Sequence, residues 1–129
     1  MPKFSLRSKE RLATCHTDIR KVCNELIKYI DFSVICGHRG KADQNKSFTE
    51  GKSKLEWPKS AHNSVPSMAV DIVPYPCDWN DIGAFKKLHG AFTVVAQQLF
   101  DEGEIGSKFE WGGNWKKLKD YPHYEIKSK

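Results

Sequence analysis

Two histidines lie where loops are expected to meet strands, and one carboxylate lies inside an expected strand. Side chains of these types bind divalent metal ions. His62 lies in a polar, turn-like stretch, Asp71 lies inside the apolar run 68–73, and His123 begins a short alternating segment. Because an ionised carboxylate buried without a partner is costly, the position of Asp71 predicts a cation beside it. Three such side chains leave the fourth position of a catalytic zinc ion open to water.

A carboxylate close to this set would complete a hydrolytic site. Zinc lowers the pKa of its bound water towards about 7, and a neighbouring carboxylate then moves the proton. Asp120, three residues before His123, is suitably placed for that task. Glu125 follows His123 at the two-residue spacing of a strand, so both side chains share one face and Glu125 can orient the imidazole. Scattered His and Asp residues are common, and this pattern is not H-E-x-x-H. Spacing alone therefore leaves the metal site a hypothesis.

The elements that must position these residues follow from hydrophobic periodicity. Apolar residues at helical spacing predict one helix over residues 8–30, with His16 inside it, and a second over 81–102, with His89 inside it. Asn80 or Asp81 is expected to cap the second helix, and Gly103 to end it. A short polar helix is predicted to begin near residue 41, and strands are predicted at 32–36, 68–73, 107–111 and 123–126. Two long helices and several strands that do not strictly alternate indicate an α+β fold.

Length and composition indicate one globular domain over residues 1–129. Hydrophobic residues make up 39% of the chain and charged residues 29%. No stretch approaches the roughly 18 apolar residues of a membrane span, and the charged N-terminus lacks the apolar block of a secretory signal. We therefore expect synthesis in a cytoplasm and no stable membrane insertion. The 4 cysteines contain no C-x-x-C pair, which favours free and mostly buried thiols.

The formal net charge of +5 favours anionic partners such as nucleic acid, acidic lipid or cell-wall polymer. Lys116, Lys117 and Lys119 form the densest basic cluster, which we interpret as a solvated face rather than a specific contact. The charges form no stripe, and no helix-turn-helix or RNA-binding motif is present. We therefore expect no nucleic-acid partner.

Two blocks of the sequence, in the same order, resemble the D-alanyl-D-alanine metallopeptidase family, whose relatives include lysostaphin-type peptidases and the hedgehog signalling domain. The family pattern is S-x-H-x-x-G-x-A-x-D, followed later by an acidic residue three before a histidine. Here Ser60-x-His62 leads to Ala69-x-Asp71, and Asp120-x-x-His123-x-Glu125 follows near the C-terminus. In size and layout the chain is similar to small phage endolysins that cleave L-alanyl-D-glutamate bonds in peptidoglycan.

The spacing departs from the family pattern at one place. Asp71 lies nine positions after His62, whereas the offset in the family is seven, and Ser67 stands at the usual glycine position. A loop that includes Pro66 is expected to absorb the two extra residues. The ligands can then still converge, and the departure bears on the shape of the adjoining cleft.

The resemblance implies that His62, Asp71 and His123 bind Zn²⁺ and that Asp120 is the catalytic base. The implied fold is a small antiparallel sheet that carries the zinc site and packs with two long helices. Gly37-x-Arg39 resembles a G-x-R segment whose arginine faces the substrate. Arg39 would then hold a peptide carboxylate or stabilise the oxyanion, and the alternative is a surface ion pair.

Other positions are implied to support the cleft. Gln44 resembles a polar residue that often follows the arginine, and Ser60 either supports a ligand or is an ordinary loop hydroxyl. The segment EWGGNW, residues 110–115, resembles the one that precedes the catalytic block. Its glycines permit close backbone approach or positive φ. Trp111 and Trp115 either wall a substrate cleft or pack in the core.

The function implied by the resemblance is zinc-dependent hydrolysis of the L-alanyl-D-glutamate bond in the bacterial peptidoglycan stem peptide, leading to host lysis. Such an endolysin is made in the host cytoplasm and reaches the cell wall, in the periplasm, after the inner membrane is permeabilised. We expect a monomer. Two alternatives stay open, a D-alanyl-D-alanine carboxypeptidase with the same ligands and a non-catalytic, zinc-containing cell-wall binding module.

Overall fold

The computed structural model describes residues 2–127, and in this range four strands form one antiparallel sheet. The strands are β1 (Phe32–Cys36), β2 (Ala69–Pro74), β3 (Phe109–Trp111) and β4 (His123–Ile126), in the spatial order β1-β2-β4-β3. The helices are α1 (Leu6–Leu12), α2 (Thr17–Leu26), α3 (Lys41–Thr49) and α4 (Ile82–Asp101), with short 3₁₀ turns η1 (Ala61–Asn63) and η2 (Gly112–Asn114). The α+β prediction is therefore confirmed.

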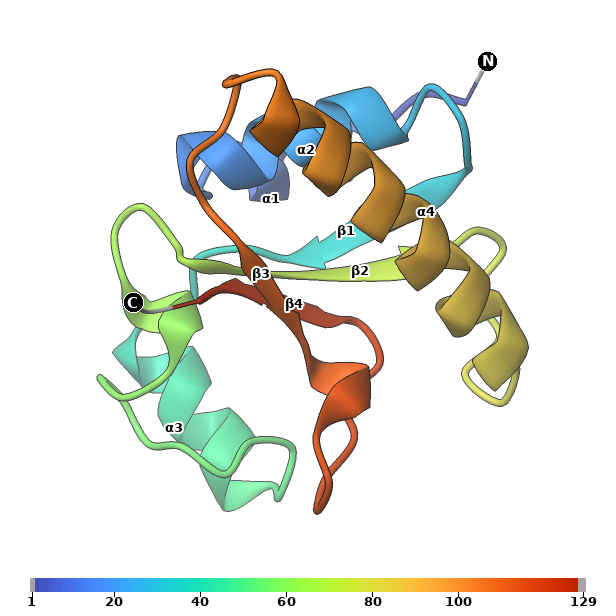
Figure 1. The fold of residues 1–129 in the computed structure, drawn as a ribbon. Coiled ribbons are helices and arrows are strands. Elements are labelled where there is room, and N and C mark those ends of the chain that lie inside the picture. Colours follow the sequence, from blue (N-terminus) through green and yellow to red (C-terminus); the bar gives the residue numbers. More distant parts are fainter. Residues whose placement is uncertain (1, 128–129) are drawn as a thin grey trace.

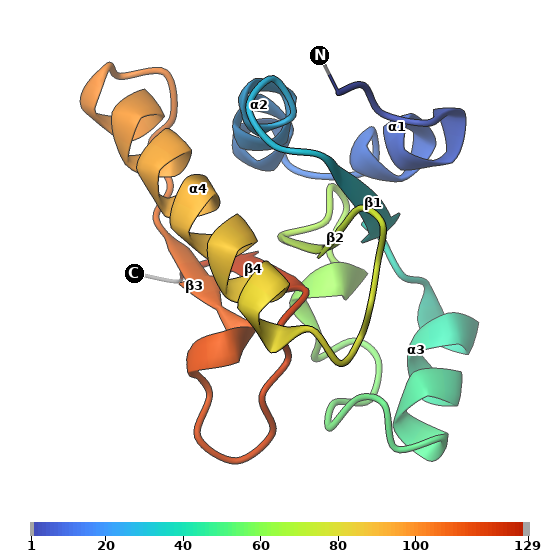
Figure 2. The same ribbon diagram turned by 90° about the vertical axis from the view of Figure 1, so that its right-hand side faces the viewer.

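The sheet separates a helical layer from an open side. Helices α1, α2 and α4 lie along one face, whereas α3 and the long loops project from the other side (Figures 1 and 2). Helix α1 packs against β1, α4 packs against β2, and α2 packs against α4. The hydrophobic core lies between the helical layer and the sheet.

Alternation along β2 explains how a carboxylate fits inside an apolar run. Val70 and Ile72 are fully buried members of the core. Because successive side chains of a strand point to opposite faces, Asp71 between them points to the open side of the sheet. Strand β4 follows the same rule, with Tyr124 in the core and His123 on the open side. In β2 and β4, alternate residues therefore contribute to the hydrophobic core and to the candidate site on the open side of the sheet.

The prediction of a single helix over residues 8–30 is wrong. The chain forms α1 and α2 with a break between them, because residues 14–16 bond to a distant segment instead of continuing the helix. The backbone N–H of His16 donates to Ser67 O (2.8 Å), and that of Ser67 donates to Thr14 O (2.9 Å). His16, expected inside the helix, is the N-cap of α2, where its Nδ1 accepts from the backbone N–H of Asp18 (3.0 Å).

Helix α4 follows the sequence prediction closely and is the one long helix among residues 2–127. The Asp81 carboxylate accepts the backbone N–H of Ala84 (3.0 Å), which caps the first turn. Gly103 has a φ of 75°, the left-handed conformation that ends many helices. None of the helices in residues 2–127 combines the length and the hydrophobicity that crossing a bilayer requires.

All four cysteines are free, as predicted, whereas the expectation of mostly buried thiols holds for only two of them. Cys15 and Cys23 are buried, Cys36 is half-buried, and Cys77 is exposed. Burial raises the pKa of the Cys15 thiol to about 12, so this side chain stays protonated and behaves as an apolar core residue.

Gly37, directly after β1, allows the sheet to approach the end of α1. A Cβ atom there would overlap the side-chain oxygen of Thr14 and the carbonyl oxygen of Arg11. We predict that Gly37→Ala lowers the free energy of unfolding by about 1–3 kcal/mol, measured by urea denaturation. Gly90, on the exposed side of α4, has open space around it, so Gly90→Ala should stabilise the protein by about 0.5–1 kcal/mol. A Gly37→Ala protein as stable as the wild type would contradict this account.

Candidate metal centre

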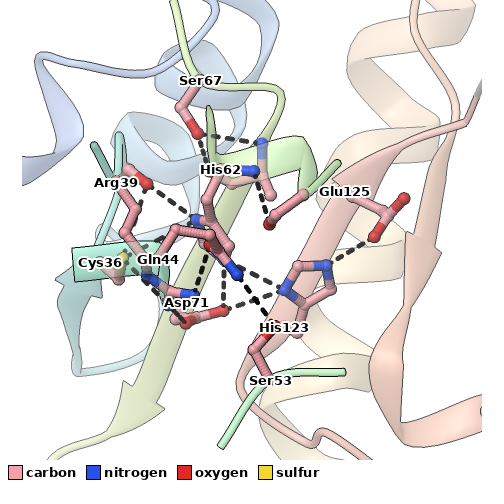
Figure 3. A network of polar contacts seen from close by, with 12 residues as sticks. Cys36, Arg39, Gln44, Ser53, His62, Ser67, Asp71, His123 and Glu125 are labelled. Carbon is pink, nitrogen blue, oxygen red and sulfur yellow. Dashed lines mark hydrogen bonds and ion pairs between the residues drawn. The ribbon is translucent and has the colours of Figure 1, made fainter. Parts of the chain in front are cut away.

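Three side chains from distant parts of the sequence meet on the open side of the sheet (Figure 3). His62 Nε2 lies 3.2 Å from Asp71 Oδ1 and 3.2 Å from His123 Nδ1, and His123 Nδ1 lies 3.1 Å from Asp71 Oδ1. Asp71 and His123 are direct partners on the neighbouring strands β2 and β4, and His62 approaches from η1. The structure thus brings the three candidate ligands to one point.

The chemistry and spacing of these atoms fit a tetrahedral metal ion. Zinc binds imidazole nitrogen and carboxylate oxygen at about 2.0–2.1 Å, which places neighbouring ligand atoms about 3.3 Å apart. The observed triangle has sides of 3.1 to 3.2 Å. Both imidazoles are buried, with exposed fractions of 2% for His62 and 5% for His123. The site can therefore hold a divalent metal ion without rearrangement of these side chains.

The remaining nitrogen of each imidazole is fixed by an acceptor. His62 Nδ1 donates to Gly37 O (2.8 Å), and His123 Nε2 donates to Glu125 Oε1 (2.7 Å). In neutral imidazoles, these bonds hold the proton on His62 Nδ1 and His123 Nε2, so His62 Nε2 and His123 Nδ1 are the nitrogens available to a metal ion. Glu125 thus makes the contact with His123 that the strand spacing predicted.

A capped turn holds His62 in place. The backbone N–H of His62 donates to Ser60 Oγ (3.2 Å), and the backbone N–H of Ser60 donates to Asn63 Oδ1 (3.0 Å), which together form a capping box. The backbone N–H of Arg39 donates to His62 O (2.8 Å) and ties the turn to the end of β1. Ser60 therefore acts on the backbone that carries the ligand.

The longer spacing between His62 and Asp71 is absorbed by an exposed loop, as expected. Residues 64–66 are exposed, whereas Ser67 is fully buried. Ser67 Oγ donates to Ala69 O (2.6 Å), which anchors the chain just before β2. The loop accommodates the longer spacing and still allows His62 to reach Asp71.

Arg39 reaches the second oxygen of the central carboxylate. Its Nη2 lies 3.6 Å from Asp71 Oδ2, and its Nη1 donates to Gln44 Oε1 (3.1 Å). Gln44 is fully buried on α3, where its Nε2 donates to Ser53 Oγ (3.0 Å) and Leu55 O (2.6 Å). Arg39 thus makes a half-buried ion pair that orients Asp71, and Gln44 connects this pair to the loop after α3.

A cleft of about 760 Å³ opens over the site. The loop after α3 and the loop after η2 border it, and Arg39, Asp71, Asp120 and Glu125 are among its lining residues. The cleft is thus large enough for a few residues of an extended peptide lying across the three candidate ligands.

The two tryptophans of EWGGNW have different surroundings. Trp115 lines the cleft, and its ring centre lies 5.0 Å from that of His123. Trp111 is a core residue that stacks on His89 at 3.8 Å and donates its Nε1–H to Tyr121 O (2.8 Å). The sequence left open whether each tryptophan lines a cleft or packs in the core. Trp115 lines the cleft, and Trp111 packs in the core.

Asp120 lies beside the triangle of ligand atoms. Its carboxylate oxygen is within 4.8 Å of ligand atoms from Asp71 and His123. The backbone N–H of Asp120 donates to Gly112 O (3.0 Å), and that of His123 donates to Asp120 O (3.1 Å). A Cβ atom at Gly112 would overlap the Asp120 backbone oxygen, so this glycine provides the close approach expected of it.

The surroundings of Asp71 and Asp120 shift the pKa values of their carboxyl groups in opposite directions. Burial alone would raise the pKa of Asp71, but His62 and His123 outweigh burial and hold that pKa well below its usual range. Burial, followed by repulsion from Asp71, raises the pKa of Asp120. Asp71 is therefore suited to bind a cation, and Asp120 holds a proton more readily than an ordinary carboxyl group does.

Sequence reasoning missed Cys36 as a neighbour of the site. Its Sγ lies 3.8 Å from His62 Nδ1 and 3.5 Å from Arg39 Nη2. A bulge between Val34 and Cys36 places this side chain opposite Asp71. The signal available in the sequence was its position directly before the G-x-R segment, although a bulge cannot be read from strand periodicity.

Comparisons with known proteins relate the chain to a family of peptidases. The sequence model of the family described as phage L-alanyl-D-glutamate peptidase matches residues 1–129. The chain is 35% identical over 132 residues to the L-alanyl-D-glutamate peptidase of Escherichia phage T5, covering 97% of this chain and 89% of the phage protein. It is 26% identical over 119 residues to the peptidoglycan L-alanyl-D-glutamate endopeptidase CwlK of Bacillus subtilis (strain 168), covering 77% of this chain and 62% of CwlK.

A solved structure extends the similarity to the fold. The crystal structure of the Serratia marcescens L-Ala D-Glu endopeptidase ChiX superposes with a TM-score of 0.77 and 30% sequence identity, covering 97% of this chain and 90% of ChiX. The family match spans the whole sequence and includes every candidate ligand. The chain therefore belongs to the family of phage L-alanyl-D-glutamate peptidases.

Proposed function

We propose that this peptidase is a zinc enzyme that cuts the L-alanyl-D-glutamate bond of the peptidoglycan stem peptide, with His62, Asp71 and His123 as the zinc ligands. The observation that carries the proposal is the triangle of ligand atoms, 3.1 to 3.2 Å on each side, in the cleft beside Asp120. Family membership supports the choice of bond.

Each residue of the site has a separate role in the proposed hydrolysis. Bound zinc would polarise the scissile carbonyl and make water a stronger acid. Asp120 takes a proton from the attacking water, whose oxygen adds to the carbonyl carbon of L-alanine. As the C–N bond breaks, Asp120 returns the proton to the departing amine of D-glutamate. Asp71 stays ionised, because bound zinc would offset its charge and Arg39 contacts its second oxygen.

Family membership supports the biological setting that we propose. A phage enzyme of this kind is made in the host cytoplasm and meets the wall once the inner membrane has been opened. We propose that it acts there as a monomer on peptidoglycan. Because each of the three ligands comes from the same chain, the site needs no second copy.

Fragment analysis of purified peptidoglycan tests the proposed bond. Mass spectrometry after digestion should detect new D-glutamate amino termini and new L-alanine carboxyl termini, at a rate that depends on added zinc. Release of single D-alanine residues in their place would identify a carboxypeptidase. Tight binding to the wall without any fragments would identify a binding module.

Gly112 should matter to activity through Asp120. Because a Cβ atom would push against the Asp120 backbone, we predict that Gly112→Ala displaces the carboxylate and lowers kcat about 10- to 100-fold. The measurement is turnover of a soluble stem peptide at saturating zinc. Gly106 has open space around it, so Gly106→Ala is the matched control and should keep wild-type kcat. Equal kcat for the two variants would contradict the proposed role of the close contact.

A further inference from the structure

Two lysine-rich segments border the catalytic cleft. Residues 51–55 read GKSKL and residues 115–119 read WKKLK, and neither segment contains an acidic residue. Lys52 and Lys54 from the first segment and Lys117 and Lys119 from the second all line the cleft. The two segments project from the same end of the molecule, the lower end in both views (Figures 1 and 2). Both segments are loops outside the helical layer, so their lysine side chains are not needed to pack the helices against the sheet.

The cations along this rim outnumber the anions that could neutralise them. Three carboxylates, those of Asp71, Asp120 and Glu125, line the same cleft. Asp71 contacts both histidines and Arg39, and Glu125 contacts His123, so these two charges already have partners.

The lysines themselves are only partly engaged. Lys52 Nζ lies 3.3 Å from Glu50 Oε1 at an exposed position, and Lys119 Nζ donates to Gly113 O (3.3 Å). Among residues 2–127, no ion pair involves Lys54 or Lys117. Positive charges gathered around a concave surface raise the local concentration of anions. The rim therefore favours a negatively charged occupant.

The chemistry of the proposed substrate identifies that occupant. In a stem peptide, D-glutamate continues through its γ-carboxyl group, so its α-carboxylate remains free unless it is amidated. The next residue is often a diamino diacid with a further carboxylate. The L-alanine side is joined to the glycan through a neutral amide. Negative charge thus lies on the D-glutamate half of the peptide.

On the basis of the proposed function, we infer that the lysines at positions 52, 54, 117 and 119 form a carboxylate-binding subsite for the D-glutamate half of the stem peptide. The enzyme therefore discriminates between free and amidated peptides. Each exposed lysine contributes modestly, and several acting together give a preference of about tenfold in kcat/KM for the free acid. Salt weakens this preference because the charges are solvent-accessible.

The test uses the zinc-loaded full chain and two soluble peptides. Both are N-acetyl-L-alanyl-γ-D-glutamyl-meso-diaminopimelic acid, one with the free α-carboxylate of D-glutamate and one with the α-carboxamide. We expect the wild type to prefer the free acid about tenfold at low salt and less at 0.2 M salt. In the double variant Lys54→Gln/Lys117→Gln, the ratio of the two kcat/KM values should fall to about threefold or less.

A matched pair of lysines controls for net charge. Lys86 and Lys87 are exposed on α4 and do not line the cleft, so Lys86→Gln/Lys87→Gln should keep the tenfold ratio. Equal cleavage of the two peptides by the wild type, or an unchanged ratio in Lys54→Gln/Lys117→Gln, overturns the subsite and leaves the proposed function intact. If the wild type cleaves neither peptide and releases no fragments from peptidoglycan, the proposed function fails, and the subsite fails with it.

Discussion

Replacing Asp120 by asparagine should lower kcat about 10²- to 10⁴-fold while the protein keeps one zinc ion per chain. The amide keeps the size of the side chain but cannot carry the proton from water to the leaving amine, and general acid–base catalysis contributes a factor of this size. Asp120 lies next to the ligand triangle and is not one of its three corners. Turnover of a stem peptide measures kcat, and elemental analysis of the same sample measures the zinc content.

The stability of this variant separates loss of chemistry from loss of structure. Burial and the charge of Asp71 raise the pKa of Asp120, so the folded chain disfavours the ionised form at neutral pH. Asparagine removes that charge. After dialysis against a chelator, the free energy of unfolding of Asp120→Asn should therefore be no lower than that of the wild type. Asp101→Asn, at an exposed position on α4, is the control and should keep wild-type kcat. Full zinc content together with wild-type kcat in Asp120→Asn would exclude Asp120 as the proton carrier.

Replacing His62 by alanine should abolish stable zinc binding and lower kcat about 10³-fold or more. Metal ions contribute several kcal/mol to such reactions, and each 1.36 kcal/mol corresponds to about a tenfold change in rate. The change also leaves Asp71 with fewer partners. Zinc at about 100 times its Kd should stabilise the wild type by about 2.7 kcal/mol, and this stabilisation should be absent in His62→Ala. Calorimetry with and without zinc measures it.

A chelator provides the same test without any substitution. Wild-type protein treated with a chelator should lose activity, and added zinc should restore it. The exposed His38 offers a matched control, since its Nδ1 bonds to Ser64 O and to none of the three candidate ligands. His38→Ala should keep one zinc ion per chain. Activity of the wild type that survives complete removal of the metal would refute the zinc mechanism.

Local patterns in the sequence were sufficient to predict β2, which carries Asp71, and the long helix α4. The two-residue period of β2 places Asp71 opposite the core residues Val70 and Ile72, and the cap at Asp81 and the stop at Gly103 define α4. These features depend on neighbours in sequence, which is why periodicity and capping rules capture them.

Features that depend on distant contacts could not be predicted in this way. The apolar spacing of Leu12, Cys15 and Ile19 continues across the break between α1 and α2, because all three side chains enter the same core. Only the bonds to Ser67 reveal the break. In the same way, the pairing of Arg39 with Asp71 depends on how β1 aligns with β2. Resemblance to a family supplied the ligand set, and the alignment of strands explains why the ligands meet.

The place of β4 in the sheet has a consequence for biosynthesis. This strand lies between β2 and β3 although it is the last of the four along the sequence. While a ribosome still holds residues 123–126, β2 and β3 lack their shared partner, and the third ligand has not arrived. On the proposed mechanism, a nascent chain that lacks this strand cannot cut peptide bonds, whatever else has folded. On the same mechanism, activity begins only after residues 123–126 have been synthesised and β4 has paired with β2 and β3.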